Sequence, residues 1–181
     1  MSRFILLIRR EIWEHKAIWV APLIVIGCLI LAALTGNIHL GPIGSSGIDT
    51  AMGAIPPEKQ ARLVLVAYAG LALVVFMVMG IVSFFYALDS LYADRRDRSV
   101  LFWKSLPLSD AETVLSKFAV AAIVIPLVAL AGAVLSQFVI AVGGSAKLAM
   151  AGQAAGVMWN PQAISGGIVI AVVWSMTAML W

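Results

Sequence analysis

The chain contains four apolar runs without a charged residue, each long enough to cross a lipid bilayer. They are Ala17–Thr35, Leu63–Tyr86, Phe118–Val142 and Ile164–Trp181. A helix rises about 1.5 Å per residue and the hydrocarbon core of a bilayer is about 30 Å thick, so the two middle runs span it with some tilt. The fourth run is the shortest and only just spans. The sequence therefore predicts about four transmembrane helices.

Composition supports the same fold class. Hydrophobic residues make up 62% of the chain and charged residues 12%, whereas a soluble domain has roughly 25% charged residues. A soluble fold of this length would lack the charges to cover its surface, and we predict an all-α, polytopic membrane protein. The net charge of +3 is spread without a basic stripe, so nucleic acid is not an expected partner. The single cysteine, Cys28, excludes an internal disulfide.

Lysine and arginine are unevenly divided between the segments that connect the apolar runs. Such residues concentrate in short cytoplasmic loops. One group lies before the first run or between the second and third: Arg3, Arg9, Arg10, Lys16, Arg95, Arg96, Arg98, Lys104 and Lys117. The segments between the first and second runs and between the third and fourth runs carry only Lys59, Arg62 and Lys147. We therefore expect a cytoplasmic N-terminus and a cytoplasmic segment 87–117, with residues 36–60 outside.

Residues 1–16 have the pattern of a separate amphipathic helix. Phe4, Ile5, Ile8 and Ile12 gather on one side of a helical wheel, and Arg3, Arg10, Glu11 and Glu14 on the other. Arg10 and Glu14 are spaced four residues apart and can pair. The pattern predicts a helix that lies in the membrane interface before turning into the first span. A simple cytoplasmic extension of that span is the alternative.

The segment 87–117 between the second and third spans has an internal order. Charges of alternating sign over 94–98 predict a solvated helical extension, and an apolar patch over 100–103 follows. Pro107 interrupts any helix, and Ser109 with Glu112 forms a capping box, so a new helix should begin at about Asp110. An apolar patch rimmed by charge favours a contact surface. Insertion of the patch into the lipid interface explains it equally well.

The stretch DRRDRSVLFWKSLPLSDAETVLSK, residues 94–117, resembles the loop after the second span of ABC-2 type transporter permeases. That loop has an acidic-Arg pair, a Leu-rich turn, Ser-Leu-Pro, a hydroxyl residue and a downstream Lys. The stretch RREIWEHK, residues 9–16, is similar to the elbow helix that precedes the first span in the same family. The resemblance extends to the organisation of the whole chain, although only these two stretches match as motifs.

The resemblance implies the membrane half of an ATP-driven transporter, whose loop after the second span docks into a separate ATPase subunit. The role carries over onto residues 99–106, and we expect the 94–112 loop to couple the two subunits. The apolar side chains would fill the groove of the ATPase, and the charges would set its register. The predicted interface residues are Arg96, Arg98, Ser99, Val100, Leu101, Phe102, Trp103, Lys104, Ser105 and Leu106.

The implied partners are a cytoplasmic ATP-binding ABC subunit, a second permease chain as homo- or heterodimer, and the lipid bilayer. The implied location is the bacterial inner (plasma) membrane, and family members with this layout resemble exporters. A different function class remains open, in which a non-transporting membrane anchor or assembly protein recruits a cytoplasmic partner through the same patch. An ATPase with a phosphate-binding loop encoded beside this protein would favour the transporter.

The spans lack the side chains that intramembrane chemistry needs. None of them contains Asp, Glu, Lys, Arg or His in its interior, and the two histidines, His15 and His39, lie on opposite sides of the membrane. We therefore predict no catalytic residue, no metal and no cofactor in this chain, with ATP hydrolysed on the partner. Ser83 and Gln137 are polar residues within spans, and are candidates either for a substrate pathway or for helix–helix hydrogen bonds.

The predicted organisation is a single transmembrane permease domain over 1–181. It comprises an elbow helix at 1–16, spans at 17–35, 63–86, 118–142 and 164–181, and a cytoplasmic coupling loop at 87–117. The family has six spans, so these four represent a partial ABC-2 type domain. We expect the sequence to be a piece of a longer protein with two further spans; a four-span subunit is the alternative.

Cysteine accessibility tests the predicted topology. A membrane-impermeant thiol reagent applied to intact cells should modify a cysteine placed at Ser46. A cysteine placed at Ser99 should react only after the membrane is broken, because the positive-inside bias places it in the cytoplasm. The opposite labelling pattern would overturn both the orientation and the coupling hypothesis.

Overall fold

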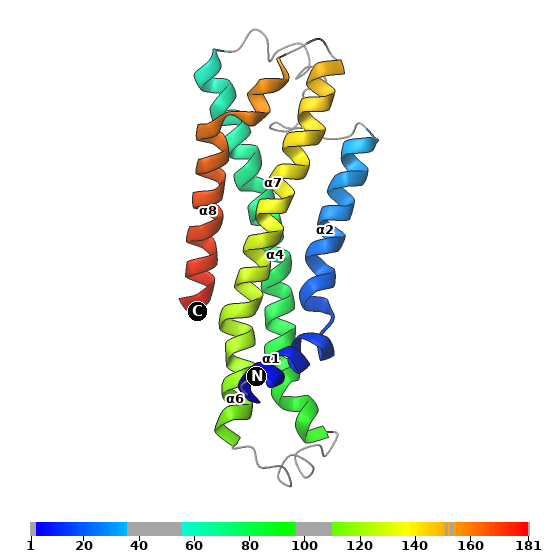
Figure 1. Ribbon diagram of the computed structural model, residues 1–181, viewed down its shortest axis with the longest axis vertical. Coiled ribbons are helices and arrows are strands. Elements are labelled where there is room, and N and C mark those ends of the chain that lie inside the picture. Colours follow the sequence, from blue (N-terminus) through cyan, green and yellow to red (C-terminus); the bar gives the residue numbers. More distant parts are fainter. Residues whose placement is uncertain (1–2, 36–55, 97–109, 151, 153, 181) are drawn as a thin grey trace.

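The computed structural model describes residues 3–35, 56–96, 110–150, 152 and 154–180. These residues form helices and no strand. Four long helices run side by side, and a short one lies across one end of the bundle (Figure 1). The helices are α1 (Arg3–Glu14), α2 (Ala17–Leu34), α4 (Pro57–Arg96), α6 (Asp110–Ala119), α7 (Ile125–Met150) and α8 (Pro161–Leu180).

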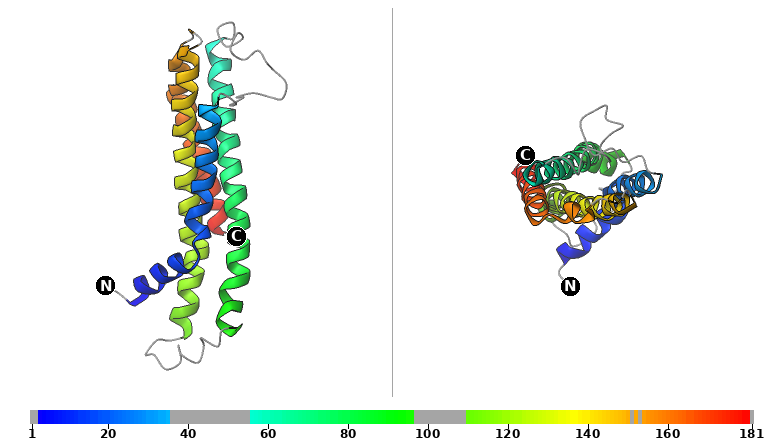
Figure 2. Two further views of the ribbon diagram at one scale, coloured as in Figure 1. Left: turned by 90° about the vertical axis from the view of Figure 1, so that its right-hand side faces the viewer. Right: turned by 90° about the horizontal axis from the view of Figure 1, so that it is seen from above.

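Three helical stretches are long and apolar enough to cross a membrane: Pro57–Ser90, Ala111–Met150 and Pro161–Leu180. A fourth span is formed if α1 and α2 are counted together, although the axes of these helices are bent by 51°. The all-α, polytopic membrane fold predicted from the apolar runs is therefore confirmed. Figure 2 shows α1 leaving the bundle at a steep angle, on the side from which α2 enters it.

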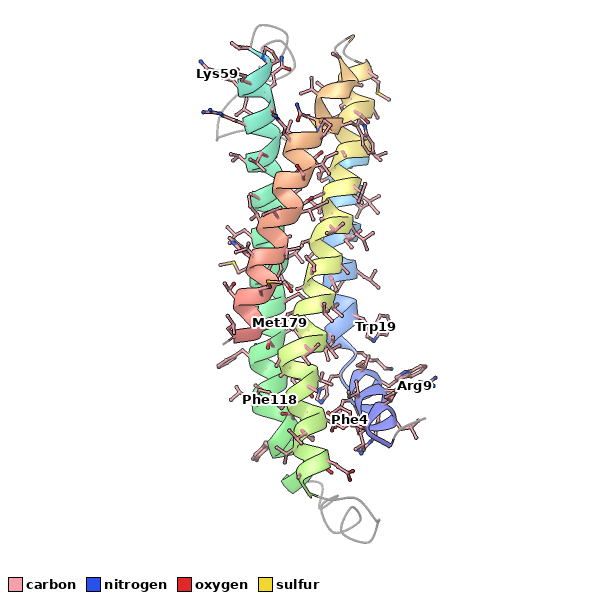
Figure 3. The ribbon with its side chains drawn as sticks, turned by 60° about the vertical axis from the view of Figure 1, so that its left-hand side comes forward. Phe4, Arg9, Trp19, Lys59, Phe118 and Met179 are labelled. Carbon is pink, nitrogen blue, oxygen red and sulfur yellow. The ribbon has the colours of Figure 1, made fainter. Side chains whose placement is uncertain are left out.

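The two ends of the bundle differ in what they carry. Helix α1, the end of α4 and the start of α6 lie together at one end, called here the α1 end (Figure 1). Figure 3 shows Phe4 and Arg9 at this end and Lys59 at the opposite end. Both borders of the segment 97–109, which is outside the described residues, are therefore at the α1 end.

Helices extend further into the predicted loop 87–117 than the apolar runs alone indicate. Helix α4 continues through Arg96, and α6 begins at Asp110, where the capping-box pattern predicts a helix start. Ser109 itself is outside the described residues. The segment that remains between the two helices, residues 97–109, contains the apolar patch and most of the predicted interface.

Two clusters of buried side chains hold the long helices together. The cluster nearer the α1 end contains Ala72, Val75 and Met79 of α4, packed with residues of α2, α7 and α8. The second cluster includes Tyr68 and Met158, and the Tyr68 hydroxyl donates a hydrogen bond of 2.7 Å to the Met158 carbonyl. This bond fixes the short 3₁₀ turn Ala155–Trp159, which precedes α8, against α4.

Glycines set the spacing of the helices where the backbones approach each other. A Cβ atom at Gly132 of α7 would lie 3.1 Å from the Cβ of Pro22 in α2. A Cβ atom at Gly166 of α8 would lie 2.9 Å from Leu65 Cδ1 in α4. Small residues at such contacts are typical of membrane helix packing, where close approach maximises van der Waals contact.

The third span is irregular next to its proline. Pro126 lacks an N–H group and cannot complete the normal helical hydrogen-bond ladder. A π-helical turn, Val120–Val124, directly precedes Ile125 and Pro126 and joins α6 to α7. The Ser175 hydroxyl of α8 donates a hydrogen bond of 3.2 Å to the Pro126 carbonyl, so the irregular turn is also tied to the neighbouring helix.

Helix α8 has a well-defined start. Asn160 accepts hydrogen bonds through Oδ1 from the backbone N–H groups of Gln162, at 2.9 Å, and Ala163, at 3.3 Å. Pro161 occupies the first helical position, where a missing N–H costs nothing. The fourth span therefore begins three residues before the apolar run that predicts it.

Candidate functional site

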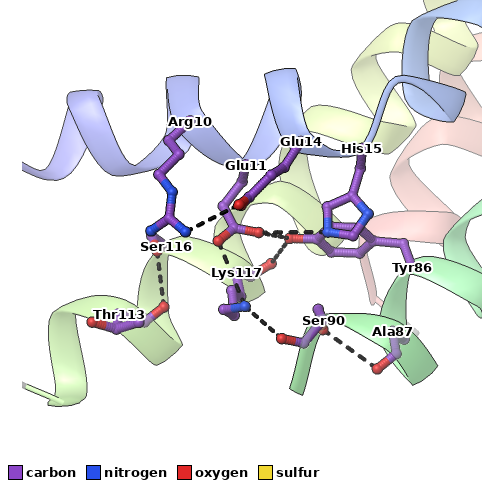
Figure 4. A network of polar contacts seen from close by, with 10 residues as sticks. All are labelled: Arg10, Glu11, Glu14, His15, Tyr86, Ala87, Ser90, Thr113, Ser116 and Lys117. Carbon is purple, nitrogen blue, oxygen red and sulfur yellow. Dashed lines mark hydrogen bonds and ion pairs between the residues drawn. The ribbon is translucent and has the colours of Figure 1, made fainter. Parts of the chain in front are cut away.

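A buried group of polar side chains joins three helices at the α1 end. It consists of Glu11 on α1, His15 in the turn after α1, Tyr86 and Ser90 on α4, and Lys117 on α6 (Figure 4). We call this group the polar junction. Its position matters because α4 and α6 are the two helices that border the segment 97–109.

An ion pair lies at the centre of the polar junction. Lys117 Nζ is 3.6 Å from Glu11 Oε1, and only 9% of the lysine side chain and 6% of the glutamate side chain are exposed. The same ammonium donates a hydrogen bond to the Ser90 carbonyl. A single lysine on α6 therefore binds both α1 and α4.

Tyr86 connects the ion pair to the backbone of α6. Its hydroxyl oxygen lies 3.4 Å from Glu11 Oε2 and 3.4 Å from the Lys117 carbonyl oxygen. Because the hydroxyl has one proton and both neighbours are acceptors, the two oxygens share it. The second carboxylate oxygen of Glu11 is thereby directed towards α4.

His15 closes the junction on the side of the α1–α2 bend. Its Nε2 atom is 3.9 Å from Glu11 Oε2, and its ring meets that of Tyr86 edge to face, with centroids 4.7 Å apart. On the outer surface of α1, Arg10 and Glu14 form the predicted ion pair, at 3.0 Å. That pair is exposed, so it contributes much less to stability than the buried one.

The burial of Glu11 differs from the sequence-based expectation. The helical wheel places Glu11 on the polar face of α1 together with Arg10 and Glu14, whereas in the structure Glu11 is only 5% exposed. Its side chain is directed from α1 towards Lys117 of α6, with which it forms the ion pair (Figure 4). A buried carboxylate requires such a cation, since an unpaired charge away from water is very costly.

The polar junction connects the two helices that border the segment 97–109. Ser90 lies six residues before the end of α4, and Lys117 lies seven residues after the start of α6. Lys117 contacts both Ser90 and Glu11, so it connects α6 to α4 and to α1. Helix α1 leads into α2 through His15 and Lys16.

Most of the predicted ATPase interface lies outside the described residues. This holds for Arg98, Ser99, Val100, Leu101, Phe102, Trp103, Lys104, Ser105 and Leu106. Arg96 is the last residue of α4, and its side chain is not described. The contacts proposed for these residues therefore stay predictions.

The structure does not bring together Ser83 and Gln137, the two polar residues predicted within spans. Ser83 is half-buried on α4, near the α1 end. Gln137 of α7 and Tyr68 of α4 both lie next to Gly167 of α8. Tyr68 is fifteen residues before Ser83, which is about 22 Å along α4. Ser83 and Gln137 cannot belong to one compact site.

Gln137 occupies an unusual environment. Its side chain is buried, and neither Nε2 nor Oε1 has a hydrogen-bond partner among the described residues. Both atoms would lie 3.1 Å from a Cβ atom at Gly167 of α8, which shows how closely the amide is packed. An orphaned buried amide reduces stability, and such groups call for a functional or conformational explanation.

Within the described residues, no group of three or more His, Cys, Asp or Glu side chains is placed to hold a metal ion. The polar junction contains a carboxylate, an imidazole and an ammonium, but the Lys117 ammonium already occupies the position where a cation would be bound. Its geometry therefore fits a structural joint between helices.

Part of the chain matches a known protein family. The model of a family described as ABC-2 family transporter protein matches residues 62–179, more than half of the chain. The match covers α4 to α8 and excludes α1 and α2. No curated protein and no solved structure matches the chain significantly.

Removal of one charge from the polar junction should destabilise the protein. Glu11→Ala leaves the Lys117 ammonium buried without its carboxylate, and we expect the free energy of unfolding to fall by about 3 kcal/mol. The double variant Glu11→Leu, Lys117→Met should regain most of this loss. Equilibrium unfolding in mixed micelles measures both. As a control, Glu14→Ala on the exposed pair should cost less than about 1 kcal/mol; equal losses for Glu11→Ala and Glu14→Ala would contradict the joint.

Replacement of the orphaned amide should have the opposite effect. Gln137→Leu has a similar volume and removes two unsatisfied polar atoms, so we expect the free energy of unfolding to rise by about 1–2 kcal/mol. Gln162→Leu, on the exposed start of α8, is the matched control and should change little. A loss of stability in Gln137→Leu would mean that the amide is paired in the folded protein.

Proposed function

Because the chain belongs to the ABC-2 family of transporter proteins, we propose that it is the membrane-spanning permease subunit of an ATP-driven exporter, coupled to a separate cytoplasmic ATPase through the 94–112 loop. Family membership and the apolar helices make it a membrane permease of an ABC transporter. The export direction, the coupling through this loop and a second permease chain in the complex belong to the proposal.

The observation that supports coupling most directly is the polar junction. Lys117 binds α4 through the Ser90 carbonyl and α1 through Glu11. A loop that merely connected two spans would not need both of its bordering helices fastened to a third helix by a buried ion pair. The arrangement suits a loop that receives force, since its borders move with α1 as one unit.

The proposed mechanism is mechanical. ATP-driven closure of the partner displaces the docked segment 97–109, and the ends of α4 and α6 follow it. The polar junction carries the displacement to α1, and the 51° bend between α1 and α2 converts a movement along the membrane surface into a tilt of the first span. A packed bundle responds to such a shift by changing between discrete arrangements, because its core is not continuously deformable.

The proposed orientation places the α1 end in the cytoplasm of a bacterial inner membrane. Most lysines and arginines precede α2 or fall between α4 and α7 in the sequence, at the end to which Figure 3 assigns Arg9. Lys59 lies at the opposite end in the same view. This distribution follows the positive-inside rule and supports docking of the ATPase at the α1 end.

Gln137 has a proposed role in the transport cycle. Its amide lacks a partner in this arrangement of the helices, and we assign its hydrogen bonds to another state, in which α7 and α8 have moved apart. Transport by Gln137→Leu should therefore be slower although the variant folds, and an unchanged rate would restrict Gln137 to helix packing. Ser83 is a separate candidate for the pathway, nearer the α1 end.

Two aromatic residues of the loop test the proposed coupling. Phe102→Ala combined with Trp103→Ala should abolish co-purification of the ATPase or uncouple its hydrolysis from transport, because buried aromatic anchors contribute about 2 kcal/mol or more each. Pull-down and transport assays in proteoliposomes measure these effects. The loss of Arg98 alone should weaken binding mildly and in a salt-dependent manner.

A matched control distinguishes docking from general damage. Phe138→Ala combined with Trp159→Ala removes two partly exposed aromatics of α7 and of the turn before α8, and it should leave ATPase binding intact. If the loop variant also keeps full binding and full transport, Phe102 and Trp103 are only interfacial anchors. If the loop variant loses ATPase binding but none of the proteins tested, the unmodified one included, shows transport, the membrane-anchor alternative is favoured.

A further inference from the structure

A groove with a volume of about 750 Å³ lies at the α1 end, where the α1–α2 bend faces α4. One wall is a single face of α4, from Ile81 to Tyr92. The other wall is formed by the bend itself, through His15, Ala17 and Ile18. This volume is within the range of pockets that hold drug-sized ligands.

The α4 wall changes from apolar to polar along its length. Ile81 and Phe85 lie towards the middle of the bundle, and both have more than half of their surface exposed. Asp89 and Tyr92 follow one and two turns later, at the end of the membrane-spanning stretch Pro57–Ser90. The wall therefore has the same polarity gradient as one leaflet of a bilayer, with apolar chains inside and headgroups outside.

The opposite wall has the same gradient. Ile18 is nearest the middle of the bundle, and His15 lies at the level of Tyr86, with which its ring makes the edge-to-face contact. Tyr86 is held in place by its bonds in the polar junction. His15 and Tyr86 are therefore fixed by other contacts, whereas Asp89 and Tyr92 are exposed.

The charges around the groove favour a cation. Asp89 is exposed, and its side chain forms no ion pair or hydrogen bond with the described residues. The other titratable groups of the lining are His15, which is next to the Glu11 carboxylate, and the phenols of Tyr86 and Tyr92. Aromatic rings beside a carboxylate attract ammonium groups through their faces, and the described residues of the lining include no lysine or arginine.

We propose that this groove binds an amphiphile with an ammonium headgroup, its nitrogen at the Asp89 carboxylate between Tyr92 and His15 and its apolar body along Ile81 and Phe85. The bound molecule would lie parallel to the lipids of the leaflet at the α1 end and could enter sideways from the bilayer. Binding depends on α2 and α4 alone, so the proposal stands apart from ATP coupling and from the role of the 97–109 segment.

Photo-crosslinking of the full chain in lipid nanodiscs, without ATP or ATPase, tests the site. The probe is a trimethylammonium with a C12 chain that carries a diazirine, and the matched probe has a sulfonate in place of the ammonium. We expect saturable labelling by the ammonium probe, mapped by mass spectrometry to α4 within 81–92 or to α2 near Ile18, and little labelling there by the sulfonate.

Two variants and a control separate charge from shape. Asp89→Asn should weaken binding of the ammonium probe about fivefold and remove the preference over the sulfonate. Ile81→Trp fills the apolar part of the groove and should block both probes. Glu58→Gln removes a carboxylate at the opposite end of α4, and the affinity should not change.

Each result decides for or against the proposal. Preferential labelling by the ammonium probe supports an ammonium site if Asp89→Asn removes the preference and Glu58→Gln keeps it. Equal labelling by both probes, or labelling unaffected by Asp89→Asn, means that the groove takes up apolar molecules only and overturns the proposed headgroup specificity. Labelling elsewhere in the chain overturns the site itself. Since ATPase binding is not measured, failure here leaves the proposed coupling untouched.

Discussion

A buried ammonium must be matched by a carboxylate, and this requirement organises one end of the protein. Lys117 lies on the helix that opens the third span, and its ammonium is 3.6 Å from the carboxylate of Glu11 on α1. Without this pair, α1 would be attached mainly through its apolar face, and that face could be buried equally well in the lipid interface. The ion pair fixes α1 in one position against α4 and α6. The coupling proposal depends on that position, because only a fixed α1 can pass a displacement to α2.

The lipid environment explains why much of the fold could be predicted. Within a bilayer every backbone N–H and C=O group must be bonded internally, so an uncharged apolar run forms a helix or does not cross. Leu63–Tyr86 therefore lies within α4, and Phe118–Val142 lies in the stretch formed by the end of α6, the π-helical turn and α7. The capping-box pattern gives the start of α6 at Asp110. The exposed pair Arg10–Glu14 was also predictable, because it depends on spacing within one helix. The family followed from residues 9–16 and 94–117, and the independent family match covers 62–179.

The contacts that build the site were not predictable in the same way, because they join residues far apart in the sequence. In the sequence Glu11 is one of the charges on the polar face of an amphipathic helix. Only the position of α6 beneath α1 shows that it is buried. From the sequence, Lys117 is one of the positive charges that indicate the cytoplasmic side. In the structure its ammonium connects α6 to a neighbouring helix. Gln137 could be recognised as a polar residue in a span, but its lack of a hydrogen-bond partner depends on how closely Gly167 allows α8 to approach.

Tyr86 and His15 belong to both features of the α1 end, and this has a thermodynamic consequence. The ring of Tyr86 lines the groove, while its hydroxyl binds Glu11 and the Lys117 carbonyl. If an amphiphile binds one arrangement of α2 and α4 more tightly than another, it must shift the polar junction towards that arrangement by the same free energy. Linkage is reciprocal, so in that case a change in the polar junction changes the affinity of the groove by the same free energy. Under both proposals the ligand site and the joint would need no longer pathway between them, because Tyr86 belongs to each.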